Sequence, residues 1–142
     1  MNWLSPYLIA LVATWVIAHI IKYFIDIATK SARSKDAQPF RSGGMPSAHA
    51  ATTTAVWMVV LVKDGWTSGL FALTTLFLLV MSHDAVRVRR ATGEQGETIG
   101  SLIDETKSKL PHPRAPKGHT PAEVGVGWLL GLIVGGVVVL IF

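Results

Sequence analysis

The stretch VGVGWLLGLIVGGVVVLIF, residues 124–142, carries no charged side chain and is long enough to cross a membrane. A helix needs roughly 20 consecutive apolar residues to span the hydrocarbon core of a bilayer. Three other stretches, residues 3–25, 45–62 and 65–82, have a similar length and almost no ionisable side chains. The sequence therefore predicts an all-α, integral membrane bundle of four transmembrane helices.

The composition agrees with this fold class. Half of the 142 residues are hydrophobic, 15% are charged, and the mean hydropathy is +0.44. A chain of this length is expected to form a single domain over residues 1–142. Because it has no cysteine, disulfides, thiolate metal sites and cysteine nucleophiles are excluded. The net charge of +4 is attributed to topology and anionic headgroups, so no nucleic-acid partner is expected.

The basic residues predict an orientation. Four spans place both termini on one side and two polar segments, about residues 26–44 and 83–123, on the other. Of 13 Lys and Arg residues, 11 lie in those segments: Lys30, Arg33, Lys35, Arg41, Arg87, Arg89, Arg90, Lys107, Lys109, Arg114 and Lys117. By the positive-inside rule, this side faces the cytoplasm and both termini are external, in a plasma (inner) membrane. The first stretch lacks a basic n-region and a clear cleavage site, so a retained helix is expected.

The third and fourth helices are predicted to extend beyond their apolar cores. Nothing breaks the third before Gly93, which predicts a helix over about 65–92. A short amphipathic helix is then expected along the cytoplasmic surface, from apolar residues at helical spacing. Its pattern is set by Ile99, Leu102, Ile103 and Thr106. The fourth helix is expected over 121–142.

The first polar cluster lies in the stretch GGMPSAHAAT, residues 43–52. Pro46 is expected in the first turn of the second helix, where free backbone N–H groups attract an anion. Gly44 and Ser47 belong to this turn, and Arg41 precedes it. His49 lies about one turn into the helix and can donate a proton to a bound oxyanion. The alternative is that Ser47 and His49 only face the membrane interface.

The second cluster, HDAVRVRR, covers residues 83–90. Asp84 ends a membrane helix, where a carboxylate usually has a partner, and the candidates are Arg41, Arg89 and His49. Arg89 and Arg90 are candidates for binding phosphate. Their alternative role is to extend toward lipid headgroups as part of a basic juxtamembrane stripe.

The third cluster, GHTPAE, covers residues 118–123. Thr120 has the features of an N-cap, with Pro121 as the first helical residue and Glu123 as the capping-box partner. That structural role can account for Glu123 completely. It does not account for His119, because a neutral imidazole held by a carboxylate is a competent nucleophile toward phosphorus.

Together the clusters are suited to phosphoryl transfer without a metal or another cofactor. Arginines bind the equatorial oxygens, one histidine attacks, and the other protonates the leaving oxygen. An alternative is metal-assisted hydrolysis at acidic residues, although no ligand spacing specifies such a site. The carboxylates concerned are Asp84, Glu94, Glu97 and Glu123.

The three motifs, in this order, resemble the divergent PAP2 family, which is related to type 2 phosphatidic acid phosphatases and vanadium haloperoxidases. The resemblance implies a phosphatase with a phosphohistidine intermediate. It makes His119 the nucleophile, Glu123 its orienting carboxylate and His49 the general acid. It also implies a set of phosphate-binding groups: Arg41, Arg89 and the Gly44–Ser47 backbone, with Lys22 or Lys35.

The sequence departs from the parent superfamily in three respects. The parent's first motif spaces Lys and Arg by six residues and continues with Pro, whereas Lys35 and Arg41 are separated by five and Ser42 follows. The parent's third motif joins an arginine to the histidine within a few residues. Here Arg89 and His119 lie 30 residues apart. The parent fold usually has six membrane helices, and this chain is predicted to have four.

The leading hypothesis is a membrane lipid phosphatase. It would cleave a phosphate monoester or diphosphate of a polyprenyl or glycerolipid at the cytoplasmic leaflet, with lipid phosphate and membrane lipids as its partners. The alternatives are a non-catalytic protein that binds anionic lipids or scaffolds a partner, and a metal-assisted phosphohydrolase. The Gly127-x-x-x-Gly131-x-x-x-Gly135 face suits close helix packing. Packing within the chain is favoured over a homo-oligomer.

Overall fold

The structure is a computed structural model that describes residues 5–28, 44–113, 115 and 118–142. Every regular element of this described part is helical, so the all-α prediction is confirmed there. The elements are α1 (Pro6–Ala28), α2 (Ala48–Lys63), α3 (Gly69–His83), a π-turn (Asp84–Val88), α4 (Arg89–Glu105) and α5 (Pro121–Ile141).

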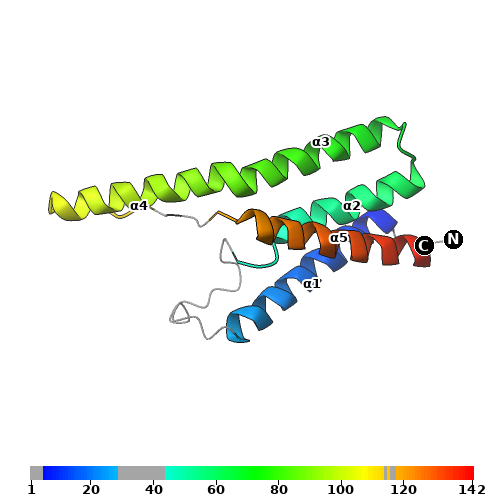
Figure 1. Cartoon of the computed structure of the whole chain (residues 1–142), viewed down its shortest axis with the longest axis horizontal. Coiled ribbons are helices and arrows are strands. Elements are labelled where there is room, and N and C mark those ends of the chain that lie inside the picture. The colour runs from blue at the N-terminus through cyan, green and yellow to red at the C-terminus, as the bar shows by residue number, and fades with distance from the viewer. Residues whose placement is uncertain (1–4, 29–43, 114, 116–117) are drawn as a thin grey trace.

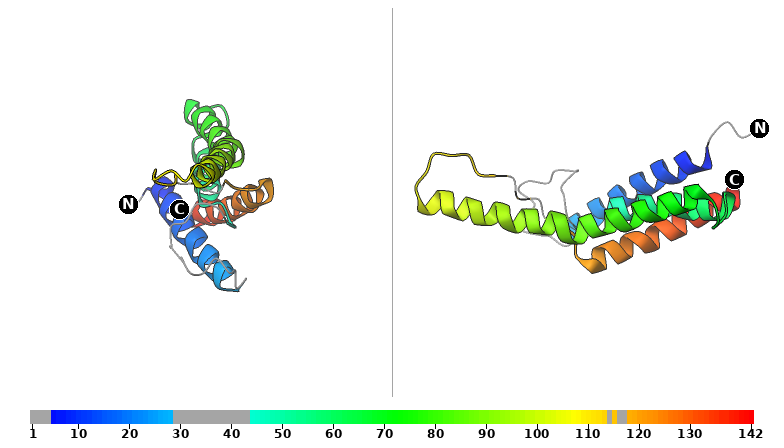
Figure 2. Two further views of the ribbon diagram at one scale, coloured as in Figure 1. Left: turned by 90° about the vertical axis from the view of Figure 1, so that its left-hand side faces the viewer. Right: turned by 90° about the horizontal axis from the view of Figure 1, so that it is seen from above.

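α2 is the central helix and packs against α1, α3 and α5 (Figure 2). Its buried side chains are small or β-branched: Ala50, Ala51, Thr54, Ala55, Val59 and Val60. The surrounding helices expose many large apolar side chains, among them Leu8, Leu73 and Leu129. Apolar side chains on the outside suit a hydrocarbon solvent, which is as apolar as leucine itself.

Within the described residues, three helices are long and apolar enough to cross a membrane: α1, the continuous helix Gly69–Glu105, and α5. The second predicted span, residues 45–62, corresponds to α2, whose 16 residues cover about 24 Å, so a fourth membrane crossing stays a prediction. The expectation that Pro46 lies in the first turn of this helix is wrong. Ser47 adopts the extended N-cap conformation, and α2 begins at Ala48.

α5 lies against α2 through a face of glycines, as the small-residue spacing indicated. A Cβ on Gly127 would stand 2.7 Å from the Ser47 carbonyl oxygen, and one on Gly135 would stand 2.7 Å from that of Ala55. A Cβ on Gly131 would overlap the Ala51 carbonyl oxygen. Only glycine lets the two backbones approach this closely, so this face is occupied within the chain.

The third helix does not end near Gly93 as predicted. α3 continues through the π-turn into α4, and the amphipathic segment around Ile99 is the last part of that same helix. A glycine costs a helix about 1 kcal/mol, which tertiary packing can offset. Gly93, Gly96 and Gly100 are all buried, and a Cβ on Gly100 would stand 3.3 Å from Nδ1 of His112 in the returning chain.

α4 therefore extends the axis of α3 and projects past the ends of the other helices (Figures 1 and 2). Its 17 residues reach about 25 Å. A separate amphipathic helix lying along the membrane surface is not what the structure shows.

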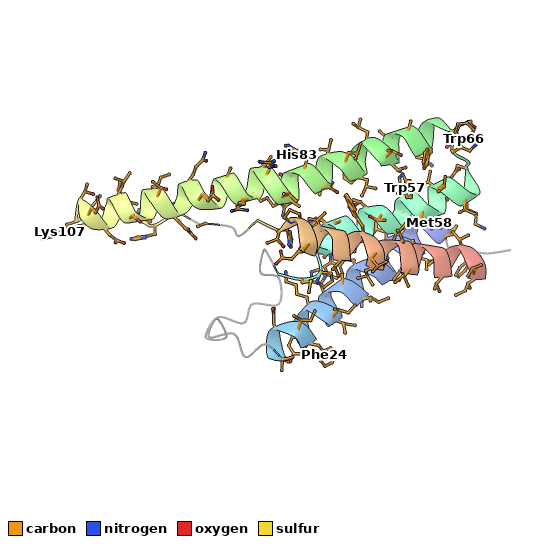
Figure 3. The ribbon with its side chains drawn as sticks, in the orientation of Figure 1. Phe24, Trp57, Met58, Trp66, His83 and Lys107 are labelled. Carbon is orange, nitrogen blue, oxygen red and sulfur yellow. The ribbon has the colours of Figure 1, made fainter. Side chains whose placement is uncertain are left out.

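The helix ends sort into two groups. Trp66, in the α2–α3 connection, lies at the same end as the start of α1 and the end of α5, whereas Phe24 marks the opposite end of α1 (Figures 1 and 3). The starts of α2 and α5 and the junction of α3 with α4 lie toward the Phe24 end (Figure 1). The three polar clusters therefore share one end of the bundle, as the predicted topology requires. Which side of a membrane that end faces stays a prediction.

Candidate active site

Two helix N-termini meet at this end of the bundle. The backbone N–H of Ser47, the N-cap of α2, donates to the carbonyl oxygen of Glu123 in the first turn of α5 at 3.1 Å. The glycine face of α5 permits this approach, because Gly127 lies against the Ser47 carbonyl. A helix N-terminus favours anions through its dipole and its exposed N–H groups. Two such ends side by side create a positive potential.

Glu123 makes the contacts that each of its two suggested roles requires. It completes the capping box of α5: its N–H donates to Thr120 Oγ1 at 3.3 Å, and its Oε2 accepts from the Thr120 N–H at 3.1 Å. The same Oε2 lies 3.0 Å from Nδ1 of His119. A carboxylate at Nδ1 favours the tautomer in which that nitrogen carries the proton. The lone pair of Nε2 is then available for chemistry.

His119 is anchored at its backbone as well. The residue is 6% exposed, and its N–H donates to the carbonyl oxygen of Ala85 in the π-turn at 2.9 Å. Gly118 lies directly on the backbone of Arg90, where an added Cβ would come within 2.6–2.8 Å. The third polar cluster is therefore docked onto the second.

Asp84 pairs with one of its three candidate partners. Its Oδ2 lies 2.7 Å from Nε of Arg89, and the two side chains are about one-third exposed. Arg90 pairs instead with Glu94, at 3.0 Å between Nε and Oε1, and is 65% exposed. Arg89 is therefore the inner, less exposed arginine, and Arg90 is the outer, more exposed one.

A shallow pocket of about 280 Å³ opens beside His119. Arg90 lines it together with Glu94, Glu97, Gly118 and Thr120. His119 also lines this pocket. The pocket lies between α4 and the segment that leads into α5.

His49, the second residue of α2, belongs to the same constellation. Arg89, His119 and Asp84 all lie close enough to His49 to act on its charge. His19 of α1 does so too, and the sequence analysis did not include it among the site residues. Nδ1 of His19 lies 2.8 Å from the Trp15 carbonyl oxygen, and the centroids of the His19 and Trp15 rings are 4.3 Å apart. The available signal was an ionisable side chain within a membrane-length apolar stretch.

α1 brings a second residue, Lys22, to the turn before α2. Gly44 has a φ of +87°, a conformation that favours glycine, and a Cβ there would stand 3.3 Å from Cε of Lys22 and 4.0 Å from Nζ. Ser47 is fully buried, does not cap α2 with its side chain, and its hydroxyl has no hydrogen-bond partner within the described residues. Arg41 and Lys35 lie outside the described residues.

The alternative metal site gains no donor set from the fold. Among the residues that the structure describes, no three His, Asp or Glu side chains are grouped so that they could hold a metal ion. Three of the four carboxylates proposed for it make ion pairs or hydrogen bonds instead: Asp84 with Arg89, Glu94 with Arg90, and Glu123 with His119.

Residues 4–134 match the family model described as "Divergent PAP2 family". The chain belongs to the divergent PAP2 family. It is also similar to the uncharacterized membrane protein YuiD of Bacillus subtilis (strain 168), with 34% identity over 107 aligned positions that cover 65% of this chain and 68% of the relative. No solved structure matches the chain. The resemblance indicated by the three motifs is confirmed, and the protein is a membrane protein of this family.

Proposed function

We propose that the protein is a membrane lipid phosphatase. It hydrolyses a phosphate monoester or diphosphate of a polyprenyl or glycerolipid through a phosphohistidine intermediate, without a metal. The observation that carries this proposal is the buried His119, held at Nδ1 by Glu123 and accompanied by His49 and Arg89. A nucleophile, its orienting carboxylate, a proton donor and an arginine are the groups that this reaction needs.

In the first step the Nε2 lone pair of His119 attacks phosphorus, and the bond from phosphorus to the leaving oxygen breaks. Protonated His49 gives its proton to that oxygen, which leaves as the lipid alcohol or, from a diphosphate, as the lipid monophosphate. In the second step water attacks the phosphohistidine and His49 takes the proton from the water. Inorganic phosphate leaves, and both histidines return to their starting states.

Several groups are positioned to hold the transferred phosphate. The N-termini of α2 and α5 supply a positive potential, and Arg89 supplies a guanidinium that Asp84 holds through Nε. Lys22 reaches the Gly44 turn from α1. Ser47, Arg90 and Arg41 complete the proposed binding set. Glycine at position 44 permits the close backbone approach that an anion requires.

The site is proposed to face the cytoplasm, with both termini external, in the plasma (inner) membrane. The support is the charge asymmetry: 11 of 13 Lys and Arg residues fall in the two segments that join the bundle at the site end. Lipid phosphates lie at that depth, and their apolar chains would remain among the exposed apolar faces of α1, α3 and α5.

The decisive experiment is to trap the intermediate. Purified protein in detergent should release inorganic phosphate from one or more of a panel of lipid phosphates labelled in the terminal phosphate. Quenching during turnover should leave an acid-labile, alkali-stable label on a peptide containing His119. No release from any substrate in the panel would overturn the proposal, and a label on an acidic residue would overturn the assigned nucleophile.

Vanadate and EDTA separate this mechanism from the metal-assisted one. Vanadate mimics the five-coordinate phosphorus of the transition state, so it should inhibit phosphate release. EDTA should leave the rate unchanged, because the histidine mechanism uses no metal. Loss of activity in EDTA that added Mg²⁺ restores would favour metal-assisted hydrolysis instead.

The two arginines should differ in their contribution. Arg89→Ala removes a charge-assisted contact worth about 1.5–3 kcal/mol, which corresponds to a loss in kcat/KM of roughly 10- to 150-fold. Arg90→Ala should lower it less, because Arg90 is the more exposed and is paired with Glu94. Steady-state kinetics on both variants measure the difference. Equal losses would contradict the inner and outer assignment.

A further inference from the structure

α3 and α4 form one continuous helix, which contains an irregular turn where they meet. Over Asp84–Val88 it is a π-helix, and the N–H of Arg89 donates to the carbonyl oxygen of Asp84, five residues back. In an α-helix the same N–H would bond to Ala85, four residues back. Single π-turns within α-helices occur frequently at functional sites. Both groups that this turn affects belong to the candidate active site.

The first affected group is the Ala85 carbonyl. Because Arg89 bonds to Asp84 instead, the Ala85 oxygen can accept the N–H of His119 at 2.9 Å. Ala85 itself is 3% exposed and packs with Ala50 of α2 and Val124 of α5. The acceptor therefore sits at a fixed place among three helices.

The second affected group is the Asp84–Arg89 ion pair. Its two residues are five apart in sequence. The backbone hydrogen bond of the π-turn joins the same two residues, from the Arg89 N–H to the Asp84 carbonyl oxygen. Two further contacts hold this part of the helix: Nε1 of Trp128 donates to Ser82 Oγ at 3.1 Å, and Gly118 lies on the Arg90 backbone. The turn is thus attached to α5 on one flank and to the chain before His119 on the other.

The geometry points to the π-turn as the positioning device of the active site: it fixes His119 through the Ala85 carbonyl and Arg89 through Asp84. This inference rests on the proposed function. The parent superfamily places its arginine and histidine close together in sequence, whereas here they lie 30 residues apart. In this structure both residues are tied to the π-turn, Arg89 by its ion pair with Asp84 and His119 by its bond to the Ala85 carbonyl. Ala85 and Gly118 act as positioning residues, since neither contributes a reacting group.

Deleting Arg87 tests this inference. Arg87 is an exposed residue within the turn, and its removal lets the turn close as an α-helix while α3 and α4 keep their register. The Arg90 N–H then lies four residues after Ala85 and takes its carbonyl, so the His119 N–H loses its acceptor. Asp84 and Arg89 become four residues apart, a spacing at which an ion pair still forms. The matched control is Arg87→Ala, which keeps the chain length.

We expect the deletion to lower kcat by about a hundredfold with little change in KM, because a misplacement of about 1 Å at a reacting group costs this much. Arg87→Ala should retain the wild-type rate. Hydrogen exchange supplies a readout that needs no substrate: the His119 amide should be protected in the wild type and in Arg87→Ala, and exchange rapidly in the deletion variant. Gly118→Ala should reproduce the loss without altering the helix, since its Cβ would collide with the Arg90 backbone.

The outcomes distinguish the two levels of the proposal. A deletion variant with wild-type kcat and a protected His119 amide overturns the positioning role, even if His119→Ala is inactive and the phosphatase assignment stands. If the wild-type protein hydrolyses no lipid phosphate, the proposed function fails. Loss of His119 protection in the deletion variant alone would then still support the anchoring of His119 by the π-turn.

Discussion

His119→Ala is expected to reduce phosphate release from lipid phosphates by a factor on the order of a thousand or more. The substitution removes the atom that bonds to phosphorus, and loss of a covalent nucleophile is among the largest single-residue effects on catalysis. The fold should survive, because the backbone contact of His119 with Ala85 does not involve the side chain. The rate of phosphate release by purified protein, together with the phosphoenzyme label, measures the loss.

The chain offers a matched control for this prediction. His83→Ala removes an exposed imidazole from the same end of the bundle, on α3, that has no part in the proposed steps (Figure 3). It should leave the rate within about twofold of the wild type, since exposed substitutions away from special features have small effects. Wild-type turnover in His119→Ala would show that another residue is the nucleophile.

Glu123→Gln tests whether Glu123 orients the His119 imidazole. The glutamine oxygen can still accept the Thr120 N–H, so the cap of α5 is largely kept. If instead its amide donates to Nδ1 of His119, the imidazole proton moves to Nε2, where it blocks attack. We expect a loss of roughly a hundredfold or more in kcat with the Tm nearly unchanged. A Tm that falls as far as in Glu123→Ala, with activity retained, would restrict Glu123 to its capping role.

The second large effect is expected from Gly131→Val. A side chain at this position would overlap the Ala51 carbonyl and stand 2.6 Å from Cβ of Thr54, so α2 and α5 would have to separate. Overpacking of a close interface costs about 1–3 kcal/mol and occasionally more, and backbone atoms cannot rotate away as side chains can. Thermal unfolding in detergent should show a markedly lower Tm.

Gly136→Val is the control for this helix. It makes the same chemical change five residues later, but a Cβ there meets no atom within 4 Å. The cost of a β-branched residue in a helix is common to both variants and cancels in the comparison. The Tm of Gly136→Val should therefore stay near that of the wild type. Equal destabilisation by the two substitutions would contradict the assignment of the packed face.

Local signals predicted much of the candidate site. The capping box at Thr120 and Glu123 depends on residues three apart, and the glycine spacing of α5 depends on a single helix, so both could be inferred from the sequence. The sequence limits the Asp84 partner to three candidates, and of the two that the structure describes, Arg89 makes the ion pair. The site residues come together because the spans alternate in direction, which the apolar stretches already indicated.

Features that depend on packing between distant segments could not be predicted. Gly93 does not end its helix, because burial by the returning chain offsets the cost of the glycine. The π-turn has no composition of its own: its sequence, DAVRV, would fit an α-helix equally well. The involvement of His19 appears only when α1 is placed beside α2, and the part of Arg41 stays a prediction because it lies outside the described residues.

The shared oxygen of Glu123 has an evolutionary consequence. A single atom, Oε2, accepts from the Thr120 N–H that starts α5 and holds Nδ1 of His119. Under the proposed mechanism, selection for folding and selection for chemistry therefore act on the same atom. If a relative loses catalysis, this carboxylate is still needed to cap α5, so substitutions at the position remain unfavourable. Relatives that have lost activity are thus expected to retain glutamate or glutamine here long after the histidine has changed.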